Sequence, residues 1–196
     1  TLERPGFLSK DGLTAAEMGT ALHAFLEHAD FAALAAAKQA GTLDEAILAE
    51  RDRQVHAQLT APEIADKLDV RRIRRFAESD AFARICAADE VLRELAFITA
   101  LPASAVLAAQ GSPAPDPETA KASVLVQGIA DIVLVFPDHL ELLDYKTDRR
   151  KTEADFLRAY RAQLNLYALA IDKRFAPKKV TYKGIYSLEL GRLIEA

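Results

Sequence analysis

An aspartate and a lysine two positions apart, Asp144 and Lys146, end an apolar run in the stretch LELLDYKT. Side chains alternate between faces along a β-strand, so both project from one face while Tyr145 points to the other. On a solvated strand such an ion pair contributes little. In a hydrolase the same pair can hold a divalent cation and orient or deprotonate an attacking water. The neighbouring residues decide between these two interpretations.

A second carboxylate, Asp131, lies in the otherwise apolar run SVLVQGIADIVLVF. A lone buried carboxylate is costly, so Asp131 requires a partner or a cation. The turn at residues 137–139 predicts a hairpin that brings Asp131 close to Asp144. Two such carboxylates favour a divalent cation between them. Gly128 removes a side chain from the same strand, at a point where another group is expected to approach the backbone.

The first half of the chain is predicted to be mostly helical. Apolar residues three and four apart predict an amphipathic helix from Thr14 to Glu27, with Thr14 as its N-cap. Further helices are expected over residues 31–58, with an interruption at residues 41–42, from Thr60 onward, and from about Asp69 to Ser79.

The second half is predicted to contain the sheet. The stretch VLRELAFITAL alternates as a strand with Leu92, Glu94 and Ala96 on one face, and SVLVQGIADIVLVF is apolar on both faces, as in an internal strand. The proline-rich residues 111–121 predict a loop. A long helix over residues 153–173 and a final strand or hairpin follow. We therefore expect one α/β domain, with a mainly helical part over residues 1–90 and an α/β core over residues 91–196.

Composition excludes several classes of protein. With 51% apolar and 28% charged residues the chain is typical of a globular domain, it has no run long enough to cross a membrane, and its net charge of −4 excludes nucleic-acid binding by bulk positive charge. The single cysteine, Cys86, excludes internal disulfides and a four-cysteine iron–sulfur cluster, fits a reducing cytoplasm, and is expected to be a small core residue. The N-terminus lacks Met and a signal peptide, so we expect a fragment of a longer protein.

Four motifs occur in order: GTALH (19–23), QGIAD (127–131), LLDYKTDR (142–149) and QLNLYALAI (163–171). Together they resemble the motif series of RecB-type nuclease domains in the PD-(D/E)XK superfamily, above all the domain that ends AddA-type helicase–nuclease subunits. The resemblance spans nearly the whole chain. It implies a restriction-endonuclease-like fold, in which a mixed central sheet is flanked by helices.

The resemblance also implies a metal site. His23, Asp131 and Asp144 would be metal ligands, the backbone carbonyl of Tyr145 would complete the shell, and Lys146 would be the catalytic lysine. Hard oxygen ligands favour Mg²⁺, and one imidazole makes Mn²⁺ acceptable as well.

Three further residues receive roles from the resemblance. Gln163 and Tyr167 lie four apart on one helical face, so both can reach one site, and in the family this pair supports the catalytic lysine and the DNA backbone. By themselves they are also consistent with a polar edge and a core aromatic. Glu94 matches a family segment in which Ala96 replaces a common proline, and we assign it a lesser role.

The expected function is that of a Mg²⁺-dependent exodeoxyribonuclease in double-strand-break repair. The resemblance implies that single-stranded DNA is delivered by an ATP-driven helicase and that an AddB-like subunit is a partner, with no membrane involved. The chain has no GxxxxGK[ST] phosphate-binding loop, so it is not itself the motor. A catalytically inactive DNA-binding or docking module of the same fold, and a phosphohydrolase of small molecules, are the alternatives.

Overall fold

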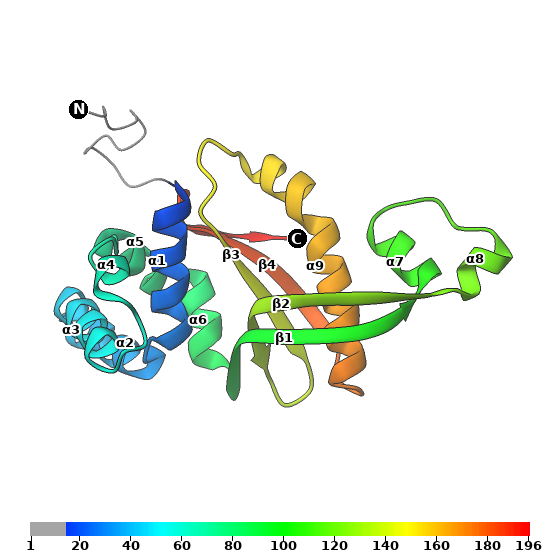
Figure 1. The fold of residues 1–196 in the computed structure, drawn as a ribbon. Helices are drawn as coiled ribbons and strands as arrows, with labels where there is room; N and C mark the ends of the chain where they lie inside the picture. Colours follow the sequence, from blue (N-terminus) through cyan, green and yellow to red (C-terminus); the bar gives the residue numbers. More distant parts are fainter. Residues whose placement is uncertain (1–14) are drawn as a thin grey trace, which may run out of the picture.

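The computed structural model describes the fold of residues 15–196, so the expected N-cap Thr14 lies outside the described residues. The N-terminal half folds as helices (Figure 1). Their bounds are α1 (Ala15–His28), α2 (Phe31–Ala40), α3 (Leu43–His56), α4 (Pro62–Ala65), α5 (Val70–Ala77) and α6 (Asp80–Ala87). The mainly helical character predicted for this half is confirmed.

Local signals set several of these helix ends. Gly41 ends α2 in the left-handed region, with φ of 78°, which accounts for the predicted interruption of the long helical segment. Asp69 caps α5 by accepting a hydrogen bond from the backbone N–H of Arg71. Ser79, expected near the end of a helix, instead caps α6, which the sequence did not predict. Cys86 in α6 is exposed, so its expected place in the core is wrong, because the apolar face of this short helix consists of other residues.

The C-terminal half contains a five-stranded mixed sheet. Its elements are β1 (Glu90–Pro102), α7 (Ala103–Ala109), α8 (Pro117–Lys121), β2 (Ser123–Val135), β3 (Leu140–Lys146), α9 (Glu153–Arg174), β4 (Val180–Ser187) and β5 (Arg192–Glu195). The strands follow the order β1-β2-β3-β4-β5, and only β3 and β4 are parallel, joined by the crossover helix α9. The β2–β3 hairpin predicted from the turn at residues 137–139 is confirmed.

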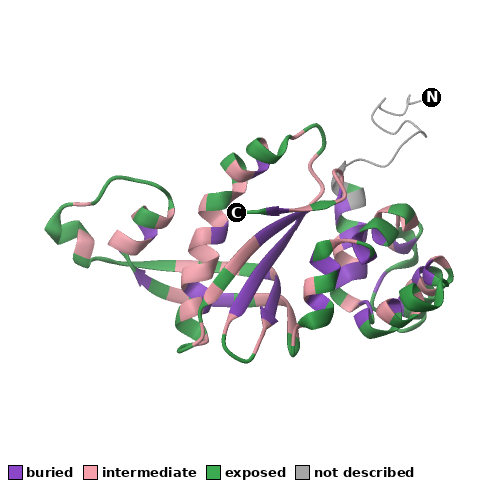
Figure 2. Ribbon diagram, turned by 180° about the vertical axis from the view of Figure 1, so that it is seen from behind, coloured by how far each residue is buried: buried purple, intermediate pink, exposed green. Residues whose placement is uncertain are grey.

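The sheet separates two cores (Figure 1). On one face the N-terminal helices contribute Leu22, Phe25, Ile73 and Phe76, which pack with Leu143, Tyr145 and Tyr186 of the sheet. On the other face α9 contributes Phe156, Leu164 and Ile171, which pack with Val133 and Leu142. We call these the helical-side core and the α9-side core. The central strands between them are the most buried part of the molecule (Figure 2).

Strands β1 and β2 continue beyond the rest of the sheet as a two-stranded arm that ends in α7 and α8 (Figure 1). The loop predicted over residues 111–121 is therefore wrong in its last part, where Asp116 caps α8. Burial of β2 on both faces is also wrong for its first half. Residues 123–129 pair with β1 alone, and their alternate side chains are exposed, because β3 pairs with β2 no farther than Ile132.

The β1–β2 ladder is interrupted at one position. Arg93 pairs with Ile132 and Leu95 with Ala130, but the intervening Glu94 and Asp131 are not paired. Glu94 has φ of 45°, in the left-handed region that disfavours residues other than glycine. Ala130 packs in the α9-side core whereas Ile132, two residues later, packs in the helical-side core.

Both strands therefore change face at this break. The expected sharing of one face by Leu92, Glu94 and Ala96 is wrong, because regular alternation stops at Glu94. Leu92 packs against the α9-side core, while Ala96 is exposed. Within residues 15–196, none of the helices combines the length and the apolar composition of a membrane span.

Candidate active site

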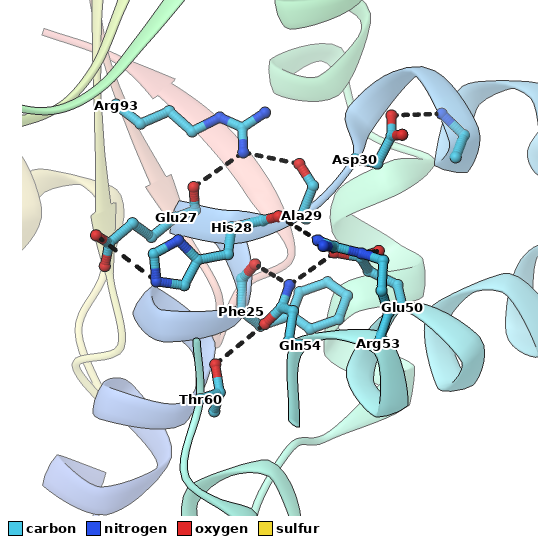
Figure 3. A network of polar contacts seen from close by, with 11 residues as sticks. Phe25, Glu27, His28, Ala29, Asp30, Glu50, Arg53, Gln54, Thr60 and Arg93 are labelled. Carbon is cyan, nitrogen blue, oxygen red and sulfur yellow. Dashed lines mark hydrogen bonds and ion pairs between the residues drawn. The ribbon is translucent and has the colours of Figure 1, made fainter. Parts of the chain in front are cut away.

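Helix α1 carries His23 and is held firmly at its C-terminal end. The guanidinium of Arg93 in β1 donates hydrogen bonds to the backbone carbonyls of Glu27 and Ala29, at 2.9 and 2.7 Å (Figure 3). It also lies 4.0 Å from the ring centroid of Phe31. These bonds satisfy carbonyls that a helix end leaves without intrahelical partners. Because Arg93 precedes Glu94, the same contact fixes α1 relative to the break in the ladder.

Helix α3 secures the same end of α1 from the other side. Arg53 donates to the carbonyl of His28 at 2.8 Å, and the buried amide of Gln54 donates to the carbonyl of Phe25 at 3.1 Å (Figure 3). The carboxylate of Glu50 accepts from both Arg53 and Gln54, so these side chains form one closed network. The C-terminal end of α1 is thus tied to α3 as well as to β1.

Near its N-terminal end α1 approaches the end of β3 closely. A Cβ atom at Gly19 would lie 2.9 Å from Oγ1 of Thr147, which is closer than such contacts normally allow. Gly19 and His23 are one helical turn apart, so the missing side chain lets α1 approach the sheet next to the histidine. The glycine of the GTALH motif is therefore explained by packing against the residue that follows Lys146.

His23 meets two carboxylates at the break in the ladder. Its Nδ1 atom lies 3.9 Å from Oε1 of Glu94 and 4.0 Å from Oδ2 of Asp131. One ligand atom from each of these three residues lies within 4.8 Å of the others. Burial, together with the negative charge of Asp131, raises the pKa of Glu94 above its ordinary value. Glu94, given a lesser role from sequence, thus lies in the centre of the site.

The backbone of β3 joins this group at Tyr145. Its N–H donates a 2.7 Å hydrogen bond to Oδ2 of Asp131, and its buried ring contacts the His23 imidazole edge to face, with centroids 5.8 Å apart. The regular β2–β3 pairing ends at Ile132 and Leu143, one residue before Asp131 and Asp144 would pair. Asp131 therefore binds the β3 backbone through its side chain.

Buried Asp144 and partly buried Lys146 form an ion pair beside this group. Oδ2 of Asp144 lies 2.6 Å from Nζ of Lys146. Burial, followed by repulsion from Asp131, raises the pKa of Asp144 to about 6 despite the nearby ammonium. Burial by itself lowers the pKa of Lys146, but the Asp144 carboxylate outweighs it and the pKa is raised overall. At neutral pH both groups are therefore charged.

Tyr160 of α9 packs against the Lys146 ammonium. The nitrogen lies 4.7 Å from the ring centroid, a distance typical of a cation–π contact. The Tyr160 hydroxyl donates to Asp148 at 2.8 Å and accepts from Lys151 at 3.3 Å, while Lys151 and Asp148 form an ion pair at 2.8 Å. No role was assigned to Tyr160 from the sequence alone. Its position three residues before Gln163, on the same helical face, was the available signal.

Of the two residues expected beside Lys146 on α9, Tyr167 packs on another part of the sheet. The ring of Tyr167 covers Gly128, where an added Cβ would lie 2.8 Å from its Cζ atom, and packs edge to face on Phe97 with centroids 4.9 Å apart. The predicted close approach at Gly128 is thus confirmed. Within the described part of the chain no hydrogen bond or ion pair joins Gln163 or Tyr167 to Lys146.

The side chains at the break are suited to a hard divalent cation. The group offers one imidazole nitrogen, from His23, and two carboxylates, from Glu94 and Asp131. Ligands about 2.1 Å from Mg²⁺ lie roughly 3 to 4 Å from one another in an octahedral shell, which is comparable with the separations seen here. Asp144 is not among these three residues, because its carboxylate faces Lys146.

Comparisons with known proteins agree with the geometry. The family model of the PD-(D/E)XK nuclease superfamily matches residues 2–192. An ATP-dependent helicase/nuclease subunit from Heliobacterium modesticaldum is 36% identical over 96% of this chain, and its counterpart from Ligilactobacillus salivarius is 32% identical over 98%. A protein of the same name from Pelotomaculum thermopropionicum is 36% identical over 97%. The chain spans only 13–14% of the length of these relatives.

Proposed function

Because this chain belongs to the PD-(D/E)XK nuclease superfamily, we propose that it is a divalent-metal-dependent exonuclease domain that hydrolyses phosphodiester bonds of DNA. One observation supports this proposal above the others: His23, Glu94 and Asp131 converge beside the Asp144–Lys146 ion pair. The relatives are named ATP-dependent helicase/nuclease subunits, which supports a fused helicase. On the motif resemblance we extend the proposal to delivery of single-stranded DNA by that helicase and to an AddB-like partner subunit.

The residues that would hold Mg²⁺ or Mn²⁺ are His23, Asp131, Asp144 and the carbonyl of Tyr145, and Glu94 lies close enough to join them. A bound ion would lower the pKa of a water molecule and polarise the scissile phosphate. Asp144 would contribute to this shell by turning its carboxylate away from the ammonium. The raised pKa of Asp144 favours this exchange, since a cation relieves the cost of burying its charge.

Lys146 then acts as a fixed positive charge. Its raised pKa keeps it protonated at neutral pH, which favours stabilisation of the negative charge that develops on the phosphate over a role as general base. Tyr160 is a positioning residue, because its ring lies against the ammonium and its hydroxyl is tied to Asp148. These contacts thus hold the Lys146 ammonium between the Tyr160 ring and the Asp144 carboxylate.

The test is degradation of end-labelled single-stranded DNA in Mg²⁺ or Mn²⁺ by the unmodified chain and by Lys146→Ala and Asp144→Ala. Lys179→Ala is the matched control, because this lysine belongs to an exposed surface ion pair with Asp172. We expect cleavage that requires the metal, disappears in both site variants and persists in the control.

Two other results would be informative. Cleavage that survives both site substitutions would refute the assignment of this site. DNA binding without metal-dependent cleavage, under every condition, would instead identify an inactive binding module. Calorimetric titration with Mn²⁺ separates a site that binds no metal from one that binds metal without turnover.

A further inference from the structure

One face of the β1–β2 arm is apolar and exposed. Its side chains form cross-strand pairs that we call the strip: Ala96 with Ile129, Ile98 with Gln127, and Ala100 with Leu125. Ile98 is 66% exposed, Leu125 65% and Ile129 52%, although isoleucine and leucine are usually buried. The opposite face of the arm packs against α9 through Phe97. From Ala96 to Ala100 the strip extends about 14 Å along the strand.

The strip leads directly to the candidate active site. Ala96 lies two residues after Glu94 on β1, and Ile129 lies two residues before Asp131 on β2. Phe97 and Ala130 pack in the α9-side core, so the strip faces the opposite side of the sheet, which is the side on which His23 of α1 meets the two carboxylates. An extended ligand that lies along the strip would therefore reach the candidate active site at His23.

Positive charge lies along the free edge of the arm. Lys173 and Arg174, at the end of α9, donate to the backbone carbonyls of Ala100 and Ala96, at 2.7 and 2.8 Å. Neither forms an ion pair with any described residue, so their charges are not neutralised by a carboxylate. Both line a shallow depression that also contains Ala96 and Ile98, two members of the strip.

We propose that the strip binds unpaired nucleotides of single-stranded DNA, with bases on the apolar floor and phosphates near Lys173 and Arg174. An apolar floor selects unpaired bases, because a duplex stacks its bases inside and presents phosphates and sugars. The cations on the edge favour a polyanion over an apolar protein partner. This inference rests on the proposed nuclease function and adds to it a place for the strand that awaits cleavage.

The test is the dissociation constant of a short fluorescein-labelled oligo-dT strand, measured by anisotropy on the 196-residue chain in EDTA. We expect Ile98→Gln with Leu125→Gln to weaken binding about five- to tenfold, since both changes remove apolar contact with bases. Leu48→Gln with Leu59→Gln is the matched control, because these leucines are also exposed, at 39% and 44%, but lie outside the arm. The control should leave the dissociation constant unchanged.

A second variant pair tests the edge. Lys173→Gln with Arg174→Gln should lower the slope of log K against log salt by about 0.7 for each phosphate that the protein no longer neutralises. Melting temperatures of all variants separate weaker binding from a failure to fold. Affinity for a duplex of the same length should change less than affinity for oligo-dT when the strip is altered.

Several outcomes would overturn the inference. The inference fails if the strip variant binds oligo-dT as tightly as the unmodified chain. It also fails if the unmodified chain shows no measurable binding. If the strip variant binds DNA normally but no longer self-associates in sedimentation, the strip is a protein interface instead. Metal-dependent cleavage by the unmodified chain that disappears in Lys146→Ala would show that the nuclease proposal holds even when the strip inference fails.

Discussion

Replacing Asp144 by asparagine is expected to stabilise the metal-free protein at neutral and alkaline pH. Asp144 is 4% exposed, and burial together with Asp131 raises its pKa from 3.8 to about 6. The charged form is therefore less favourable in the folded chain than in the unfolded chain. Asparagine keeps the shape of the side chain and removes this charge, although it also removes the partner of Lys146.

The magnitude and its pH dependence follow from the pKa. Below pH 3.8 the carboxyl group is protonated in both the folded and the unfolded chain, so its ionisation does not lower the free energy of unfolding. Between 3.8 and about 6 the unfolded chain releases its proton first, and the stability of the unmodified protein falls as pH rises. Above about pH 6 the penalty is constant at roughly 3 kcal/mol, because a rise of one in pKa is worth about 1.4 kcal/mol. For a domain of this size that is up to roughly 10 °C in Tm.

Urea denaturation in EDTA at about pH 4 and about pH 8 measures the effect. We expect Asp144→Asn to exceed the unmodified chain in free energy of unfolding at the alkaline pH, with the difference shrinking toward the acidic one. Asp148→Asn is the matched control with the opposite sign, because Lys151 and Tyr160 outweigh burial and lower the pKa of Asp148. Equal or lower stability of Asp144→Asn at the alkaline pH would refute the claim that the buried charge of Asp144 lowers the free energy of unfolding.

Three further changes test other parts of the site. Gly128→Ala should lower the free energy of unfolding by about 1 to 3 kcal/mol through overpacking against Tyr167, and urea denaturation should show a smaller loss when Tyr167 is also alanine. An equal loss in both backgrounds would mean that this contact is not the cause. Glu94→Gly should raise the Tm of the metal-free protein, because it relieves about 1 kcal/mol of left-handed backbone strain, yet weaken Mn²⁺ binding in calorimetry. Unchanged Mn²⁺ affinity would remove Glu94 from the site. Tyr160→Phe, which keeps the ring beside Lys146, should retain most of kcat in the cleavage assay, whereas Tyr160→Leu should lower kcat more than it raises KM. Equal activity of the two variants would argue against positioning by the ring.

Much of the site was predictable because it depends on short-range regularities. The same-face placement of Asp144 and Lys146 follows from strand alternation, and their ion pair agrees with it. The hairpin follows from the turn at residues 137–139, and the long helix α9 begins at a capping box formed by Thr152 and Asp155. These features need only local geometry, which the sequence encodes directly.

The parts that could not be predicted depend on contacts between distant segments. The change of face at Glu94 occurs because two strands lose their pairing together, and neither strand alone contains that information. Exposure of the first half of β2 depends on where β3 ends, not on the apolarity of β2 itself. Tyr160 contacts the Lys146 ammonium whereas Tyr167 packs on Gly128 and Phe97, and both contacts join α9 to strands that are distant in sequence.

The break in the ladder also separates the length of the arm from the assembly of the site. Beyond Glu94 and Asp131 the arm is a regular two-stranded ribbon about 27 Å long, measured from Glu94 to Pro102 at the usual rise per residue. Removing one residue from each strand would invert every side chain between the deletion and the tip of the arm. Removing two from each would keep all faces and shorten the arm by about 7 Å. Length changes in this ribbon are therefore expected in steps of two residues per strand. Such steps would change the distance between the helical tip and the site without changing the faces of the side chains.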